Sequence, residues 1–165
     1  MAHKPNQVGR ILIQRNWRGM WGSPKRSFRH VLRDGRRVHR LYSEVQYRDP
    51  HLGTKWQDQS HSPARFVYWA KDSVLDLIFS LRYNEPHCWH IHADAHKSYQ
   101  RHLNSRAKMT RVNWQTGGTT YFWKELYQDD HLLDCECENL VRAIQLGLVP
   151  VPDENPAAYQ GQLGV

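Results

Sequence analysis

The sequence feature that most constrains the fold is an amphipathic helix within residues 120–146. Counting from Leu133, apolar residues recur at the spacing of one buried helical stripe, at Cys137, Leu140, Val141, Ile144 and Leu148. A helix with a single apolar stripe needs a body of protein to pack against, so we expect the rest of the chain to serve as its scaffold. We expect Asp129 or Asp130 to cap its start.

The same helix carries acids beside its apolar stripe. At about 100° per residue, Asp134 falls at the margin of the stripe, with Asp130 one turn before it and Glu138 one turn after it. Acids in a first turn often only complement the helix dipole, which explains Asp130 better than Asp134. Three carboxylates at this spacing repel one another, so a bound cation or a basic surface is the natural compensation.

Charge is unevenly distributed along the 165 residues, whose formal net charge is +7. Residues 1–50 hold 12 of the 23 Lys and Arg residues and 3 acids, whereas residues 120–165 hold 8 acids and 2 basic residues. A basic half and an acidic cluster are typical of a protein that holds a polyanion beside a cation site. Nucleic acid is therefore the expected partner, with ordinary basic loops on a soluble domain as the alternative.

Length and composition predict one intracellular domain. We expect it to cover residues 1–149 and to bury about two-thirds of its unfolded surface, with residues 150–165 as a disordered tail because they lack any hydrophobic period. Three cysteines argue against a disulfide framework. No apolar run approaches the length of a membrane span.

The basic half contains two candidate DNA-binding segments. Residues 8–15 predict a short strand and residues 16–27 a loop broken by glycine and proline, with cations interleaved with tryptophans. Residues 27–46 predict a hairpin around Asp34-Gly35, with residues 47–64 as a loop. The cations of the first segment are Arg15, Arg18, Lys25 and Arg26, and those of the hairpin are Arg29, Arg33, Arg36, Arg37 and Arg40.

The middle of the chain predicts a strand, a helix and a second hairpin. Residues 65–71 predict a buried strand, and the next segment predicts a helix with Val74, Leu77, Ile78 and Leu81 on one face. Asp72 is most simply the N-cap of that helix, although the carboxyl end of a strand is also where α/β proteins keep their sites. Residues 108–125 predict two strands joined at Gly117-Gly118.

Residues 87–96 hold four histidines and leave two alternatives open. One is a zinc site with two nitrogen and two sulfur ligands, although Cys-x-Cys on a helix points its thiols about 200° apart. Its ligands would be His90, His92, Cys135 and Cys137. The other is a nicking site, because His90-Ile91-His92 followed by Tyr99 resembles the motif of endonucleases that nick single strands.

From Trp123 onward the sequence resembles the nuclease half of the large terminase subunit of tailed phages, in its lambda-like branch. That family has a tryptophan, a polar spacer, Asn-His or Asn-Glu, two further residues, Asp-Cys-Glu and a helix of small apolar residues. This chain has the same order, with Asp130 in place of the usual Asn: Trp123, Asp130, His131, Leu132, Leu133, Asp134, Cys135, Glu136 and the helix through Ala143.

A looser resemblance covers roughly residues 8–148. The family's strand, Gly-Val-Asp, two residues, Lys-Asp and Leu-rich helix are matched by residues 70–76, with Leu75 in place of the Lys. An aromatic, a His, then Tyr, three residues and Leu are matched by Trp89, His92, Tyr99 and Leu103, although Arg106 stands where that family's helix has Glu.

The resemblance implies an α/β fold of the RNase H-like kind, with a mixed sheet flanked by helices and incomplete at its N-terminal side. The family's first two catalytic acids would lie ahead of Met1. It implies an endonuclease that cuts concatemeric double-stranded DNA during genome packaging with two Mg²⁺ or Mn²⁺ ions. Asp134 and Asp72 would be catalytic and would bind metal together with Asp130, with His131 and His92 as secondary candidates.

The resemblance also implies partners and a location. The partners are double-stranded DNA, the rest of the large terminase with its ATPase, the small terminase subunit and the portal, in the cytoplasm of an infected or lysogenic bacterium. No G-x-x-x-x-G-K-[ST] motif occurs, so this chain cannot drive translocation. The alternative is a non-catalytic DNA- or terminase-binding module, as a split or decayed copy.

Overall fold

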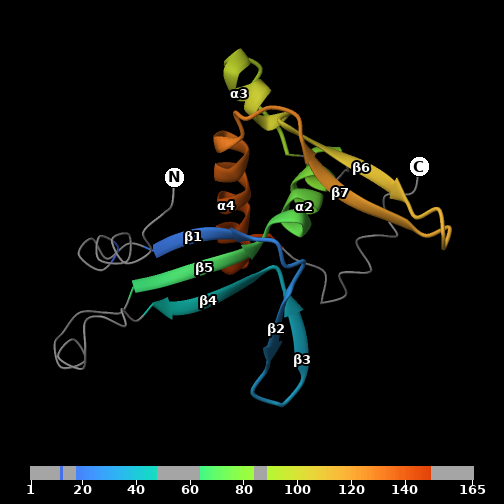
Figure 1. Cartoon of the computed structure of the whole chain (residues 1–165). Coiled ribbons are helices and arrows are strands. Elements are labelled where there is room, and N and C mark those ends of the chain that lie inside the picture. The colour runs from blue at the N-terminus through green and yellow to red at the C-terminus, as the bar shows by residue number, and fades with distance from the viewer. Residues whose placement is uncertain (1–11, 13–17, 48–63, 84–88, 150–165) are drawn as a thin grey trace. The chain divides into compact units, whose positions relative to one another are not determined.

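The computed structural model describes residues 12, 18–47, 64–83 and 89–149, which form a mixed α/β structure (Figure 1). The chain divides into two compact units, Met1–Ala70 and Lys71–Val165. The single domain expected over residues 1–149 stays a prediction, and the expected tail lies outside the described residues. The elements are β1 (Arg18–Ser23), β2 (Phe28–Val31), β3 (Arg37–Arg40), β4 (Tyr42–Tyr47), β5 (Ala64–Ala70), α2 (Lys71–Tyr83), α3 (Lys97–Leu103), β6 (Arg106–Val112), β7 (Thr119–Glu125) and α4 (His131–Gln145).

The first unit contains a mixed three-stranded sheet in the order β1-β5-β4. Strand β5 is central: β1 runs parallel to it and β4 antiparallel, with Met20 and Glu44 both opposite Val67. Strand β5 is also the most buried part of this sheet, which confirms the buried strand predicted for residues 65–71. Its buried side chains are Phe66, Val67, Trp69 and Ala70.

Strand β1 occupies a segment that the sequence predicted as a loop, and that prediction is wrong. A Cβ placed on Gly19 would lie 2.7 Å from ring carbons of Phe66. The glycine therefore permits β1 to approach the Phe66 ring on β5 closely, instead of ending a strand. Of the strand predicted at residues 8–15, only Leu12 is described, and its backbone is helical.

The hairpin predicted at Asp34-Gly35 is confirmed as β2 and β3. The N–H of Gly35 donates to the carbonyl of Leu32 at 2.9 Å, and the N–H of Leu32 donates to the carbonyl of Arg36 at 2.8 Å. Gly35 has φ +84, a left-handed conformation that glycine adopts at little cost. The second predicted strand is divided, because β3 ends at Arg40 and the following β4 pairs with β5.

In the second unit, α4 packs against α2 and α3 (Figure 1). The apolar stripe predicted for α4 is largely confirmed, but Leu148 is 72% exposed. The helix ends before it, where Gly147 with φ +71 donates to the Ile144 carbonyl and Leu148 donates to the Ala143 carbonyl. The buried residues of the two long helices are Leu133, Cys137, Leu140 and Val141 on α4 and Val74, Leu75, Leu77 and Ile78 on α2.

The remaining elements of this unit are α3 and a second hairpin. Strands β6 and β7 pair as predicted, with Gly117 at φ +66 in their turn. Helix α2 begins at Lys71, so Asp72 lies inside its first turn and the predicted N-cap role is wrong. No helix in the described ranges is long and apolar enough to span a membrane.

Candidate functional site

Asp134 lies in the first turn of α4 with a side chain that is 34% exposed. The Lys71 ammonium, at the start of α2, lies 3.3 Å from Oδ1 of Asp134 and donates a hydrogen bond to Oδ2 at 3.4 Å. Oδ1 is enclosed and accepts no hydrogen bond from any described residue. The cation that the sequence required for this acid therefore comes from the chain itself.

Asp130 stands at the N-cap position of α4 but makes no capping hydrogen bond through its side chain. Its Oδ2 instead accepts a hydrogen bond from Nη2 of Arg106, at the start of β6, and the two side chains are only 15% and 12% exposed. Burial raises the pKa of the Asp130 carboxyl, but the Arg106 hydrogen bond and the charges of Arg106 and Lys71 outweigh it, so its pKa lies below the ordinary value. The predicted N-cap position of Asp130 is confirmed, but its side chain does not cap the helix, because a guanidinium is a stronger partner for a carboxylate than a backbone amide.

A third carboxylate, Asp76 on α2, is held from the β6–β7 hairpin. Nζ of Lys108 lies 2.9 Å from its Oδ1, and Nε1 of Trp123 donates to the same oxygen at 3.0 Å. Trp123 packs on Phe79 of α2 with 4.7 Å between ring centroids. These contacts anchor the base of the hairpin to α2.

The structure brings two of the three predicted metal ligands, Asp130 and Asp134, close together. Asp130, the N-cap residue of α4, and Asp134, in its first turn, lie one turn apart, each with its own cation. Asp72 follows Lys71 in the first turn of α2. Within the described ranges, no group of three or more His, Cys, Asp and Glu side chains is placed to hold a metal ion. Mg²⁺ or Mn²⁺ binding by Asp134, Asp72 and Asp130 stays a prediction, since further ligands would have to come from elsewhere.

Glu138, one turn after Asp134 on α4, is affected both by burial and by the like charge of Asp134. Burial, followed by the nearby charge of Asp134, raises the pKa of the Glu138 carboxyl. Asp134 and Glu138 therefore share an environment in which added positive charge is favourable.

The two secondary candidates, His131 and His92, are both exposed but lie in different segments and have different neighbours. His131 is the exposed first residue of α4, with its ring 6.3 Å from that of His102. His92 is exposed, and its Nδ1 lies 3.7 Å from Oδ2 of Asp94.

Tyr99 bears on the nicking alternative. Its hydroxyl donates to Oε1 of Glu136 at 2.6 Å, and burial together with Glu136 raises its pKa to about 12. A nucleophilic hydroxyl needs a nearby base or a lowered pKa. The environment of Tyr99 changes its pKa in the opposite direction.

The two cysteines of α4 lie on different sides of the helix, in keeping with the predicted angle between them. Cys137 is buried and Cys135 is exposed. Burial raises the pKa of the Cys137 thiol well above its ordinary range. The zinc alternative needs both thiolates at one ion, which this arrangement does not favour.

The predicted DNA-binding cations divide between β1, the segment after it and the β2–β3 hairpin. Arg15 lies outside the described residues, while Arg18, Lys25 and Arg26 are exposed. On the hairpin, Arg37 is opposite Val31 and Arg40 is opposite Phe28, so these two arginines point to opposite faces. Nε of Arg36 lies 2.6 Å from Oδ2 of Asp34, which lowers the pKa of that carboxyl.

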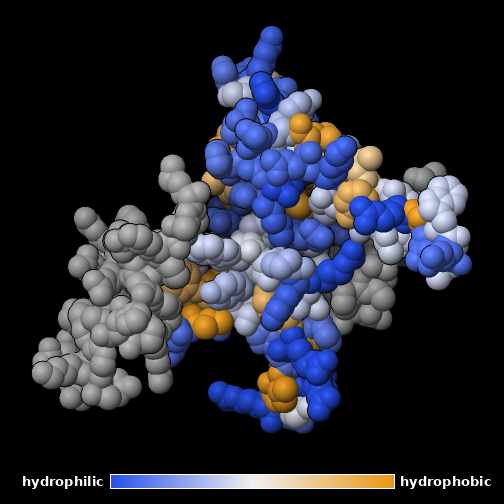
Figure 2. Space-filling model, viewed as in Figure 1, coloured by the Kyte–Doolittle hydropathy of each residue, from blue (hydrophilic) through white to orange (hydrophobic). Residues whose placement is uncertain are grey.

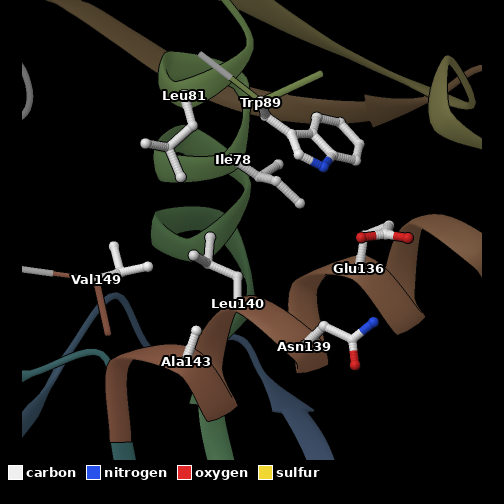
Figure 3. A pocket seen from close by; sticks show the side chains of 8 residues that line it. All are labelled: Ile78, Leu81, Trp89, Glu136, Asn139, Leu140, Ala143 and Val149. Carbon is white, nitrogen blue, oxygen red and sulfur yellow. The ribbon is translucent and has the colours of Figure 1, made fainter. Parts of the chain in front are cut away.

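Sequence reasoning missed a groove of about 370 Å³ between α2 and α4 (Figure 3). Apolar side chains from both helices line most of it, and Glu136 and Asn139 lie on one side. Its other lining residues are Ile78, Leu81, Trp89, Leu140, Ala143 and Val149. No sequence signal could have found it, since Trp89 and Val149 lie outside both helices.

The sequence and the structure were compared with known proteins. No family model and no curated protein matches the sequence, and no solved structure matches the chain.

Proposed function

We propose that this chain is the distal part of an RNase H-like nuclease of the phage large-terminase type, in the cytoplasm of an infected or lysogenic bacterium. Its reaction would be divalent-metal-dependent cleavage of concatemeric double-stranded DNA during genome packaging. The observation that carries the proposal is the Asp134 carboxylate: its Oδ1 is enclosed and accepts no hydrogen bond from the described residues, although the Lys71 ammonium lies 3.3 Å away. Such an oxygen is a suitable ligand for Mg²⁺ or Mn²⁺.

The surroundings of Asp134 also support this role. Asp130, the N-cap residue of α4, lies one turn before Asp134, and the Lys71 ammonium lies 3.3 Å from Oδ1 of Asp134. A cation beside a metal-binding carboxylate is well placed to contact a DNA phosphate. When bound, the ions would activate water and stabilise the leaving oxygen. Asp134, with Asp72 and Asp130 as further candidates, would help to hold them, and the missing ligands would come from the proximal part of the terminase.

A second candidate function is a non-catalytic module that binds DNA or the rest of the terminase. The observation that favours it is internal neutralisation: Asp130 pairs with Arg106 and Asp134 pairs with Lys71. An acid that is already paired has less need of a metal ion. In this case the cations of the first unit would bind DNA, and the acidic cluster would be structural.

A nicking assay on supercoiled plasmid with Mn²⁺ separates the two functions. The chain alone should cut weakly or not at all, and adding a polypeptide with the proximal nuclease part should produce cleavage. Asp134→Ala should lower that cleavage by orders of magnitude, because it removes negative charge where the ion binds. The matched control is Asp129→Ala, since Asp129 is an exposed acid just before α4 that pairs only loosely with Arg101, at 3.6 Å.

Two outcomes would overturn the nuclease proposal. Strong cleavage that survives Asp134→Ala would place the active site elsewhere. Intact DNA binding without cleavage in any mixture would favour the binding module.

Calorimetric titration with Mn²⁺ provides a readout that does not depend on cleavage. If Lys71 and the metal share Asp134, Lys71→Gln should tighten Mn²⁺ binding and Asp134→Ala should abolish it.

A further inference from the structure

The β6–β7 hairpin extends beyond the helices of its own unit (Figure 1). Within the described part of the chain its two strands hydrogen-bond as a sheet only with each other. Arg106 and Lys108 anchor its base to α4 and α2, whereas every residue from 109 to 121 is exposed. The distal half is therefore a ribbon available to a partner.

One face of this ribbon is basic and carries no acid. The register places Ala107 opposite Lys124, Met109 opposite Phe122 and Arg111 opposite Thr120, and side chains of directly opposed residues share a face. The guanidinium of Arg111 lies 5.1 Å from the centroid of the Phe122 ring. Because Arg111 rests on a ring rather than on a carboxylate, its positive charge stays available to a polyanion.

The turn of the hairpin presents one aromatic ring to solvent. Trp114 is 93% exposed, the most exposed of the large apolar side chains in the described ranges. Its neighbour Asn113 donates from its N–H to the Gly118 carbonyl at 2.8 Å and accepts at Oδ1 from the Gln115 N–H at 3.0 Å. Gly117 closes the turn with a 2.8 Å hydrogen bond to the Asn113 carbonyl. The backbone that carries the indole is thus held by hydrogen bonds, so binding does not have to order the turn.

We propose that this hairpin is a binding site for unpaired DNA, in which Arg111 and Lys124 contact phosphates and Trp114 stacks on a base. Cations beside an exposed ring are the recurring elements of single-strand binding surfaces. A paired duplex hides its base faces, so stacking by Trp114 there would require opening a base step. The site goes beyond the proposed nuclease and does not use Asp134.

Other partners fit this surface less well. The turn around Trp114 contains amide, hydroxyl and glycine residues. The hairpin's other exposed large apolar side chains, Met109, Val112 and Tyr121, are each at most 44% exposed, so the apolar area offered to a membrane or a protein pocket is small. The visible surface of the hairpin is mostly pale to blue, meaning neutral to hydrophilic (Figure 2). The net charge of +7 also favours a polyanion.

Fluorescence anisotropy of a labelled single-stranded oligonucleotide tests the proposal, with the matching duplex and phosphatidylserine vesicles as separate arms. Trp114→Ala should weaken single-strand binding roughly 5- to 150-fold, and Trp114→Phe should retain most of it. The double change Arg111→Gln with Lys124→Gln should lower the salt slope by about one unit. The controls are Leu148→Ala, which removes another exposed apolar side chain, and Lys97→Gln, which removes an exposed charge outside the hairpin.

Single-strand affinity unchanged by Trp114→Ala would overturn the proposal. So would a loss equal to that caused by Leu148→Ala, or a preference for the vesicles over the oligonucleotide. Circular dichroism should show an unaltered fold for Trp114→Ala, because the side chain is almost wholly in solvent. Since no cleavage is measured, failure here is distinguishable from failure of the nuclease proposal.

Discussion

The two hairpins of this chain have similar ingredients and different surroundings. Each is rich in basic residues, and each turns at a glycine with positive φ, +84 at Gly35 and +66 at Gly117. On β6–β7, Arg106 and Lys108 pair with carboxylates of α4 and α2. On β2–β3, the carboxylate that pairs with an arginine among the described residues is Asp34, in the hairpin's own turn.

The difference shows that the number of cations on a ribbon does not determine what they do. Arg106 is 12% exposed and faces a carboxylate that is 15% exposed, so the pair is part of the interior. Arg36 is 75% exposed, so its pair with Asp34 is surrounded by water and contributes little stability. Partly buried cations, Arg106 and Lys108, hold the base of β6–β7 in place, whereas the exposed arginines of β2–β3 remain available to a polyanion.

The largest expected effect comes from Arg106→Met. It leaves the Asp130 carboxylate in a largely buried position without its partner, and should lower the free energy of unfolding by about 3–5 kcal/mol. Urea denaturation followed by circular dichroism measures the loss. Arg111→Met on the exposed half of the same hairpin should change stability by less than about 0.5 kcal/mol. Equal losses from both changes would mean that the two halves of β6–β7 do not differ.

The acid dependence of stability tests the same ion pair. The folded state lowers the pKa of Asp130 from its ordinary 3.8, so the stabilisation is fully present above that pH and is lost as the pH falls through the lower folded pKa. Melting temperatures measured from pH 6 down to about pH 2 should show this loss in the parent. Asp130→Asn should flatten that part of the curve, and an unchanged curve would contradict the pairing.

The next largest effect concerns DNA binding by β2–β3. Replacing Arg36, Arg37 and Arg40 together with Ala should weaken binding at any DNA sequence and reduce the salt slope by about one to three units. Because Arg37 and Arg40 lie on opposite faces of the ribbon, the smaller value is expected if DNA contacts one face only. Stability should hardly change. A salt titration that reproduces the parent slope would remove this hairpin from the DNA-binding surface.

The smallest expected effect is one that the hairpins should share. Gly35→Ala and Gly117→Ala each force a side chain into a left-handed conformation, at a cost of about 1 kcal/mol. Among the described residues, apart from the adjacent ones in the chain, no atom lies within 4 Å of a Cβ added at either site, so backbone strain is the expected effect. Thermal denaturation should give similar losses, and a much larger loss at one glycine would show that its turn has a further role.

The sequence predicted the elements whose signals are local. The Asp34-Gly35 turn, the Gly117-Gly118 turn and the apolar stripe from Leu133 depend on neighbouring residues, and all three are confirmed in position. Strand β1 was missed because Gly19, taken alone, resembles a residue that ends a strand. In the structure a glycine is needed there because the Phe66 ring leaves no room for a Cβ. Such contacts between distant segments leave no local pattern.

The candidate site was predicted only in part, for the same reason. Spacing placed Asp134 beside the buried stripe and showed that it needed a cation, but that cation, Lys71, lies 63 residues away. The sequence predicted that Asp130 caps the helix, but its carboxylate accepts a hydrogen bond from Arg106, 24 residues before it, and not from the helix backbone. Sequence periodicity indicates that a charge needs compensation, and only the folded chain identifies the partner.

The placement of the two thiols on α4 makes this helix easy to label selectively. Cys135 is exposed and directly follows Asp134, whereas Cys137 is buried with a raised pKa and will react slowly with maleimides. In a Cys88→Ser background, a nitroxide spin label should therefore attach at Cys135. Paramagnetic Mn²⁺ bound at Asp134 would broaden the resonance of that label. The broadening would therefore report directly whether the metal is bound beside this helix.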